Sequence, residues 1–194
     1  MTVYPNAKIN LGLNVVERRS DGYHNIETIF YPIGIQDVLQ VEPSGMCSDY
    51  SFSSSGIPVG GDPENNLIIR AFRLLRSHYQ FPPVDITLHK QIPFGAGLGG
   101  GSSDAAFMLK ALNELFELKI PTRKLEQLAA GLGADCPFFI RNEPVYATGI
   151  GNVFTPIDLS LRDYWLLLVK PDIHVSTAEA YAGITPARSA ISLL

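Results

Sequence analysis

The most informative stretch of the chain is Pro93-Phe94-Gly95-Ala96-Gly97-Leu98-Gly99-Gly100-Gly101-Ser102-Ser103-Asp104-Ala105-Ala106, in which five of the seven residues from 95 to 101 are glycine. Glycines let consecutive backbone N–H groups converge on one point, and the N-terminus of a following helix adds its positive dipole. Apolar residues recur at helical spacing from Ala105 to Phe116. Ser102 or Ser103 is expected to cap that helix. The stretch predicts a phosphate-binding loop in preference to a flexible Gly/Ser connector.

Two other phosphate-binding motifs fit the stretch poorly. A Walker loop would use Gly95 and Gly100, but its lysine position holds Gly101. A dinucleotide fingerprint would also match, after an expected strand at residues 84–89, but it requires an acid at the end of the next strand. That place holds residues 118–121, which we expect to be a turn between two helices. A nicotinamide site is therefore disfavoured.

Composition narrows the remaining possibilities. The 194 residues are 46% hydrophobic and 18% charged with a net charge of −4, as expected for a globular chain of one domain or a little more. No membrane span or secretory signal is evident, so we expect a cytoplasmic protein. Cys47 and Cys136 lack the spacing of a disulfide framework or zinc site. The acidic balance disfavours nucleic acid as a partner, so a phosphorylated ligand must be held by N–H groups and a few cations.

The hydrophobic pattern predicts both strands and helices. In the first part of the chain we expect a strand–turn–strand unit over residues 3–16, a polar turn over 18–24, and short strands at 28–31 and 36–41. A mobile loop or hairpin is expected over residues 44–62 and an amphipathic helix over 65–79. A later helix is expected to be capped by Thr122, to run through Leu128 and to end at Gly131. The two-residue period of a strand places Lys8 and Asn10 on one face. One polar face on a strand indicates a site, although a lone lysine is also typical of a surface.

The C-terminal third contains an isolated acid and a long apolar run. Asp135 lies in a glycine-hinged apolar turn, where a carboxylate needs a cation or hydrogen-bond donors, and an ordinary turn or cap is an equal alternative. Residues 146–152 form a second small glycine turn. Residues 164–169 are all apolar and predict a strand buried on both faces, which would begin a new layer. Too few residues follow to finish a second core, so we expect a truncation.

Three segments together resemble the GHMP kinases, named for galactokinase, homoserine kinase, mevalonate kinase and phosphomevalonate kinase. The segments are Pro5-Asn6-Ala7-Lys8-Ile9-Asn10-Leu11, residues 93–106, and Gly133-Ala134-Asp135. Residues 19–24, 64–67 and 131–138 are most similar to the branch that phosphorylates a cytidine-diphosphate-linked methylerythritol in isoprenoid biosynthesis. The glycine loop alone identifies only the superfamily, whereas Asp-Gly-Tyr-His with Gly-Ala-Asp-Cys-Pro is specific to that branch. The resemblance covers residues 3 to about 181.

The resemblance implies a two-domain fold of the mixed α+β and α/β class. Residues 1–155 would form an ATP-binding domain like domain 2 of ribosomal protein S5. Residues 156–194 would begin a ferredoxin-like substrate domain that is incomplete in this chain. The implied activity is ATP-dependent phosphorylation of the 2-hydroxyl of the cytidine-diphosphate-linked methylerythritol, with Mg²⁺ bridging the β- and γ-phosphate oxygens.

The resemblance also implies roles for individual residues. Asp135 would accept the hydroxyl proton, and Lys8 would hold Asp135 ionised and orient that hydroxyl. The ATP site would comprise Pro93, Gly95, Gly97, Gly99, Gly100, Gly101, Ser102 and Ser103, with Asn65 and Lys90 near the adenine. The cytidine end would be held by Asn10, Tyr23, His24, Thr177 and Tyr181. No residue is assigned as a metal ligand, and Asn152 stands where the family often has an acid.

Two alternatives remain open from the sequence. One is another activity on the same fold, either a different GHMP small-molecule kinase or a diphosphate decarboxylase. The other is a non-catalytic ATP-binding remnant, because the chain is short. The sequence gives no prediction of the oligomeric state.

Overall fold

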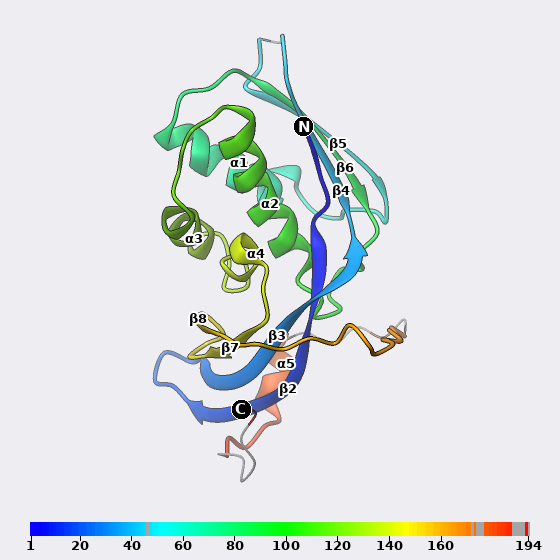
Figure 1. The fold of residues 1–194 in the computed structure, drawn as a ribbon, viewed down its shortest axis with the longest axis vertical. Coiled ribbons are helices and arrows are strands. Elements are labelled where there is room, and N and C mark those ends of the chain that lie inside the picture. Colours follow the sequence, from blue (N-terminus) through cyan, green and yellow to red (C-terminus); the bar gives the residue numbers. More distant parts are fainter. Residues whose placement is uncertain (46, 172, 174–176, 188–192, 194) are drawn as a thin grey trace.

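The structure is a computed structural model that describes every residue except 46, 172, 174–176, 188–192 and 194. Two four-stranded sheets organise it (Figure 1). The first has the order β1 (Thr2–Val3), β4 (Val38–Pro43), β6 (Val84–Lys90) and β5 (Tyr50–Gly56). The second has the order β2 (Asn6–Arg18), β3 (His24–Gln36), β7 (Val145–Thr148) and β8 (Val153–Pro156).

Helices α1 (Leu67–His78) and α2 (Gly100–Leu115) lie over one face of the first sheet (Figure 1). Helix α3 (Thr122–Ala130) and the single turn α4 (Phe138–Arg141) pack against α2. Asn66 caps α1 by accepting the Ile68 N–H at 2.8 Å, and the buried stripe of α1 includes Ile69, Phe72 and Leu75. Buried side chains alternate along β6, as expected for a strand with one face on a core. The expected helix at 65–79 is thus confirmed, with Asn66 and Tyr79 as its caps.

The second sheet is built on one long antiparallel pair, β2 and β3, whose register runs from Asn6 opposite Gln36 to Arg18 opposite His24. The expected turn inside residues 3–16 is wrong, because β2 continues through Gly12 with a register shift between Leu11 and Leu13. Gly12 has a φ of +66°, and such a bulge bends a strand without reversing it. The expected short strands at 28–31 and 36–41 are parts of β3 and β4.

The expected loop or hairpin at residues 44–62 instead contains β5, which pairs in parallel with β6. Serine hydroxyls bridge the two strands. Ser53 Oγ lies 3.2 Å from Thr87 Oγ1, and Ser55 Oγ lies 3.0 Å from His89 Nδ1. Only Tyr50 and Phe52 alternate with serines here, and the rest of the strand is Ser and Gly, so the hydrophobic pattern is too short to indicate a strand.

Helix α2 begins earlier than expected. Its N-cap is Gly99, and Ser102 and Ser103 lie inside the first turn rather than capping it. Likewise Pro121, not Thr122, is the N-cap of α3. Neither N-cap residue makes a side-chain hydrogen bond, so the first N–H groups of both helices have no capping side chain.

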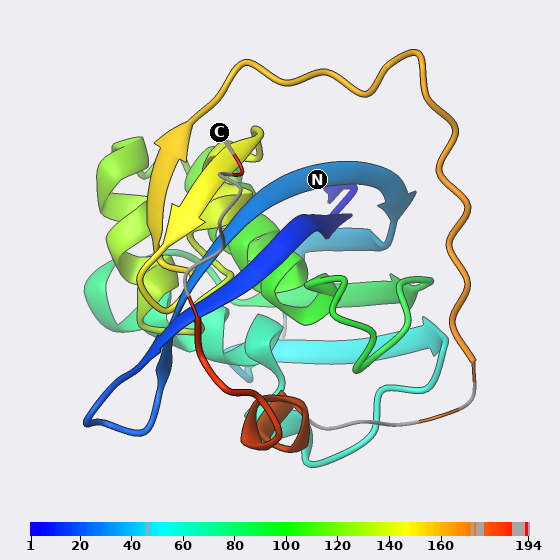
Figure 2. The same cartoon turned by 90° about the horizontal axis from the view of Figure 1, so that it is seen from below.

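Residues 164–169 contradict the expected buried strand. They form no strand, and Trp165, Leu167 and Val169 are highly exposed. Figure 2 shows this segment arching away from the sheets before it reaches α5 (Thr177–Ala182). An apolar run becomes a buried strand only where a neighbouring strand and a covering layer accept it, and no described strand pairs with this one. After α5 the chain returns to β2, where the Ala187 N–H donates to the Val15 carbonyl at 3.0 Å.

Candidate active site

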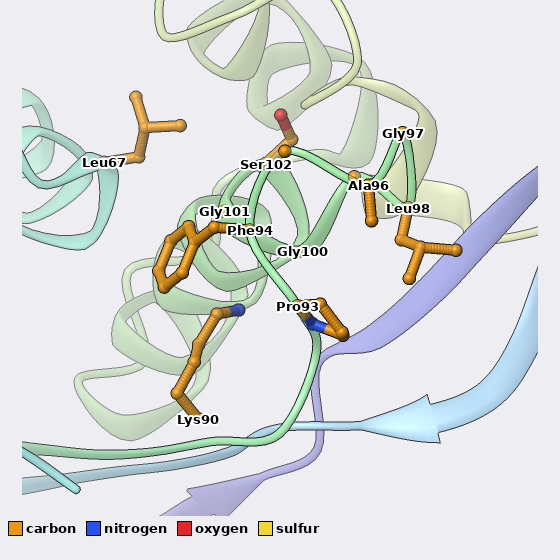
Figure 3. Close-up of a pocket in the computed structure, with 12 residues that line it drawn as sticks. Leu67, Lys90, Pro93, Phe94, Ala96, Gly97, Leu98, Gly100, Gly101 and Ser102 are labelled. Carbon is orange, nitrogen blue, oxygen red and sulfur yellow. The ribbon is translucent and has the colours of Figure 1, made fainter. Parts of the chain in front are cut away.

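The glycine-rich loop lies between the end of β6 and the start of α2 and surrounds a cavity of about 190 Å³ (Figure 3). Gly95, Gly97 and Gly99 have φ angles of +64°, +71° and +69°, which L side chains rarely adopt. The cavity is lined by Leu67, Lys90, Pro93, Phe94, Gly95, Ala96, Gly97, Leu98, Gly99, Gly100, Gly101 and Ser102. The predicted phosphate loop is therefore a walled pocket at a helix N-terminus, a geometry suited to anions.

Glycine is required at positions 99 and 100 because the neighbouring atoms are too close for a side chain. A Cβ at Gly99 would lie 2.9 Å from Phe139 Cζ and 3.2 Å from Lys8 Cγ. A Cβ at Gly100 would lie 2.8 Å from Ile92 Cγ2 and 2.9 Å from Lys90 Nζ. The loop is packed against its surroundings, which argues against a flexible connector.

Lys8 and Asp135 lie beside this loop. Lys8 Nζ is 3.5 Å from Asp135 Oδ2 and donates a hydrogen bond to Asn10 Oδ1 at 2.7 Å. The Lys8 backbone N–H donates to the Leu98 carbonyl at 2.9 Å, so β2 is tied directly to the glycine loop. The Lys8 side chain is 6% exposed and that of Asp135 is 33% exposed. A shielded cation thus holds a carboxylate that remains open to a ligand.

A larger cleft of about 890 Å³ adjoins the loop on the side of Asp135. Gly97 and Gly99 line both this cleft and the smaller cavity. The cleft is lined by Lys8, Asn10, Leu13, Arg18, Gly22, Tyr23, His24, Ile26, Phe30, Gly97, Gly99, Ala134, Asp135, Ile150, Gly151, Tyr181 and Ile184. The Lys8–Asp135 pair therefore lies where a phosphate-sized pocket and a substrate-sized cleft meet.

Aromatic side chains form another part of the cleft wall. His24 and Tyr181 stack with ring centroids 5.1 Å apart at 28°, and Tyr23 is 61% exposed on its polar turn. Burial raises the pKa of Tyr181, and the nearby charge of Asp135 raises it further. The ring partner of Tyr181 in this structure is thus His24, another residue expected at the cytidine end. These rings offer a platform on which a flat ligand can stack.

Most of the predicted substrate-site residues come together in this cleft, among them Asn10, whose side-chain N–H donates to Thr28 Oγ1 at 3.0 Å. Thr177 is the first residue of α5. Asn152 is a turn residue whose side chain accepts the Ile150 N–H at 3.3 Å.

Three predicted ATP-site residues either lie outside the lining of the smaller cavity or are almost completely buried. Asn65 ends the 3₁₀ turn η1 (Pro63–Asn65) and lines neither cavity. Ser103 is fully buried, and its N–H donates to the Gly99 carbonyl at 2.8 Å. Lys90 lines the smaller cavity, but only 1% of it is exposed.

The partners of Lys90 were not predicted from the sequence. Its Nζ donates to Asp37 Oδ2 and, at 2.9 Å, to Asp104 Oδ2, and all three side chains are buried. Burial raises the pKa of Asp104 to about 7; the charge of Lys90 opposes this shift and that of Asp37 adds to it. Both acids stand within apolar stretches, which is the signal that could have identified them.

Among the described residues, no group of three or more His, Cys, Asp or Glu side chains could hold a metal ion. Over the same residues, no helix has the length and apolar character needed to cross a bilayer.

Comparison with known proteins gives consistent results. Residues 66–143 match the family described as GHMP kinases N terminal domain. A 4-diphosphocytidyl-2-C-methyl-D-erythritol kinase from Parabacteroides distasonis is 58% identical to this chain over 193 residues. The match covers 100% of this chain and 70% of that protein. A crystal structure of 4-(cytidine 5'-diphospho)-2C-methyl-D-erythritol kinase superposes on 82% of this chain and 56% of its own, with a TM-score of 0.71 at 43% identity. The mevalonate kinase of Methanococcus jannaschii shares the fold, with a TM-score of 0.60 at 14% identity, over 81% of this chain and 56% of its own.

The glycine-rich pocket at the start of α2, with the Lys8–Asp135 pair beside it, agrees with the class that the comparisons show: the GHMP kinases, which are ATP-dependent small-molecule kinases. Within that class, the chain belongs to the 4-diphosphocytidyl-2-C-methyl-D-erythritol kinase family. It spans about two thirds of the length of its curated relatives and 56% of the solved structure. The resemblance to this branch of the GHMP kinases and the mixed α/β fold are thereby confirmed.

Proposed function

We propose that this chain supplies the ATP site and the catalytic base of an enzyme that phosphorylates the 2-hydroxyl of 4-diphosphocytidyl-2-C-methyl-D-erythritol. The observation that carries the proposal is the position of Lys8 and Asp135. The pair lies at the junction of the glycine-loop pocket and the larger cleft, where a phosphoryl group and an acceptor hydroxyl would meet.

The chemistry follows from this placement. The loop N–H groups and the N-terminus of α2 would hold the triphosphate of ATP. Asp135 would accept the proton of the acceptor hydroxyl while the hydroxyl oxygen bonds to the γ-phosphorus. The bond between the γ-phosphorus and the oxygen that bridges it to the β-phosphate would break, which releases ADP. Lys8, whose Nζ lies 3.5 Å from Asp135 Oδ2, would keep Asp135 in position and would contact the same hydroxyl. Phosphoryl transfer depends mainly on such positioning and charge stabilisation.

The remaining cleft is suited to the cytidine end of the substrate. Tyr23 exposes its ring there, and the His24–Tyr181 stack presents a second aromatic surface. Asn10 is hydrogen-bonded to both Lys8 and Thr28, so its amide is fixed in the wall between the base and the aromatic end. Thr177 is proposed to join this group from α5.

Mg²⁺, when bound, would neutralise charge on the β- and γ-phosphates. The donors that face the two cavities are few, with the Ser102 hydroxyl in one and the Asp135 carboxylate in the other, so the ion would be held mainly by ATP itself. We further propose that residues 1–155 are the nucleotide domain, that residues 156–194 belong to a second domain, and that the reaction takes place in the cytoplasm.

The test is a substrate panel assayed with the full-length protein. With ATP and Mg²⁺, we expect phosphorylation of the cytidine-diphosphate-linked methylerythritol and none of mevalonate, homoserine or galactose. Turnover of one of those alcohols instead would favour another GHMP kinase activity, and carbon dioxide release from a diphosphate substrate would favour a decarboxylase. ATP binding with no turnover of any of them would favour a non-catalytic remnant.

A further inference from the structure

Lys90, Asp37 and Asp104, which we call the buried triad, lie behind the glycine loop. Asp37 is 0% exposed, Lys90 1% and Asp104 3%. They come from three separate elements: the β3–β4 junction, the end of β6 and the first turns of α2. One ammonium between two carboxylates is stable in a protein interior only when its hydrogen bonds are made, so this arrangement holds the three elements in one geometry.

The triad is bonded to both ends of the phosphate loop. At the entry, Asp37 Oδ1 accepts the N–H groups of Gln91 and Ile92 at 2.6 and 2.9 Å. At the exit, Lys90 Nζ donates to Asp104 at 2.9 Å. Figure 3 shows the Lys90 side chain rising beneath the loop with its Nζ close to the turn at Gly100. The loop can approach this closely only because residue 100 has no side chain.

We propose that Lys90 is a positioning residue for the triphosphate rather than a contact for the adenine. Two of the three protons of its ammonium group are donated to carboxylates, and only 1% of Lys90 is exposed, so little of it is open to a ligand. The buried triad fixes where the loop starts and where α2 begins, and so sets the direction of the N–H groups that bind phosphate. This inference rests on the proposed ATP site and assigns the residues that shape it.

The positioning role and an adenine contact predict different nucleotide selectivity. A residue that reads the base changes the ratio of ATP to GTP affinity when it is replaced. A residue that shapes the phosphate loop lowers both affinities by the same factor, because the two nucleotides share the triphosphate. We expect Lys90→Met to weaken the binding of both nucleotides by about tenfold, which corresponds to about 1.4 kcal/mol.

Removal of the ammonium alone leaves two buried carboxylates without their cation, which can unfold the protein. The double variant K90M/D104N avoids this, because the one remaining carboxylate, Asp37, still accepts two backbone N–H groups. Lys110→Met is the matched control. Lys110 lies on α2, the helix that carries Asp104, is partly buried with its Nζ 4.3 Å from the centre of the Phe107 ring, and lines neither cavity.

The experiment measures ATP and GTP affinity by calorimetry in the full-length protein, with thermal unfolding as a check on folding. An equal loss for both nucleotides in folded K90M/D104N, with Lys110→Met unchanged, supports the inference. Unchanged affinities, or a loss confined to ATP, overturn it and leave the proposed function standing. Failure of the unaltered protein to bind ATP overturns the proposed function, and the inference with it.

Discussion

Asp104 provides a quantitative test of the buried triad through the pH dependence of stability. Its pKa is raised from 3.8 to about 7 in the folded protein, with burial as the largest cause. Between these two pH values the folded state holds a proton that the unfolded state has released. The free energy of unfolding contributed by Asp104 is therefore greatest at low pH and is lost as the pH rises toward 7.

Asp104→Asn removes this titration while keeping an oxygen that can accept the Lys90 hydrogen bond. The loss in the unaltered protein is about 1.4 kcal/mol per pH unit within the window, or about 3 kcal/mol between pH 5 and pH 8. The variant does not lose this contribution, so the difference in unfolding free energy, variant minus unaltered protein, should rise by about 3 kcal/mol from pH 5 to pH 8.

The assay is urea unfolding of both proteins at half-unit steps from pH 5 to pH 8, with the free energies compared at each pH. Glu114→Gln, an exposed acid on the same helix, is the control and should follow the unaltered protein. Parallel curves for Asp104→Asn and the unaltered protein would refute the reasoning, because they would mean that Asp104 is ionised in the fold at no cost.

Three further predictions concern the site. Asp135→Asn should lower the turnover rate by about 100- to 10,000-fold with little change in ATP affinity, measured by kinase assay and calorimetry; near-normal turnover would remove Asp135 from the mechanism. Gly101→Val should weaken ATP binding without lowering the melting temperature, since a Cβ there meets only Leu67 at 3.7 Å; equal affinity would show that phosphate does not approach this residue. Tyr23→Ala should raise the Michaelis constant for the cytidine substrate by about tenfold or less and leave that for ATP unchanged; indifference of both constants would exclude a stacking role.

The parts of the site that could be predicted from the sequence are those set by local chemistry. Residues 95–101 bend because glycine permits positive φ, and that property needs no tertiary contact to be recognised. For Asp135 the local sequence indicated only that a carboxylate in an apolar turn requires a partner, and it left a site residue and an ordinary turn equally open. Its partner, Lys8, could be assigned only through the resemblance, because the two residues are far apart in the chain and meet only in the fold.

The parts that could not be predicted depend on contacts between distant segments. Asp37 and Lys90 are 53 positions apart, so no spacing rule joins them, and Lys90 was expected beside an adenine instead. Strand β5 is held by serine hydroxyls and backbone bonds to β6, which hydropathy does not register. The apolar run at 164–169 predicted a buried strand, yet no described strand pairs with it.

The backbone bond from the Lys8 N–H to the Leu98 carbonyl explains why these local features form one site. It joins β2, the strand that carries the Lys8 ammonium, to the loop that would hold the triphosphate. Gly99 fits between Lys8 and Phe139 only because it lacks a side chain. On the proposed function, the distance between the phosphoryl group and Asp135 would be set by these main-chain contacts on one side and by the buried triad on the other. Changes at Asp135 should therefore alter the chemical step alone, whereas changes at Gly99, Gly100 or Lys90 should alter nucleotide binding and the chemical step together.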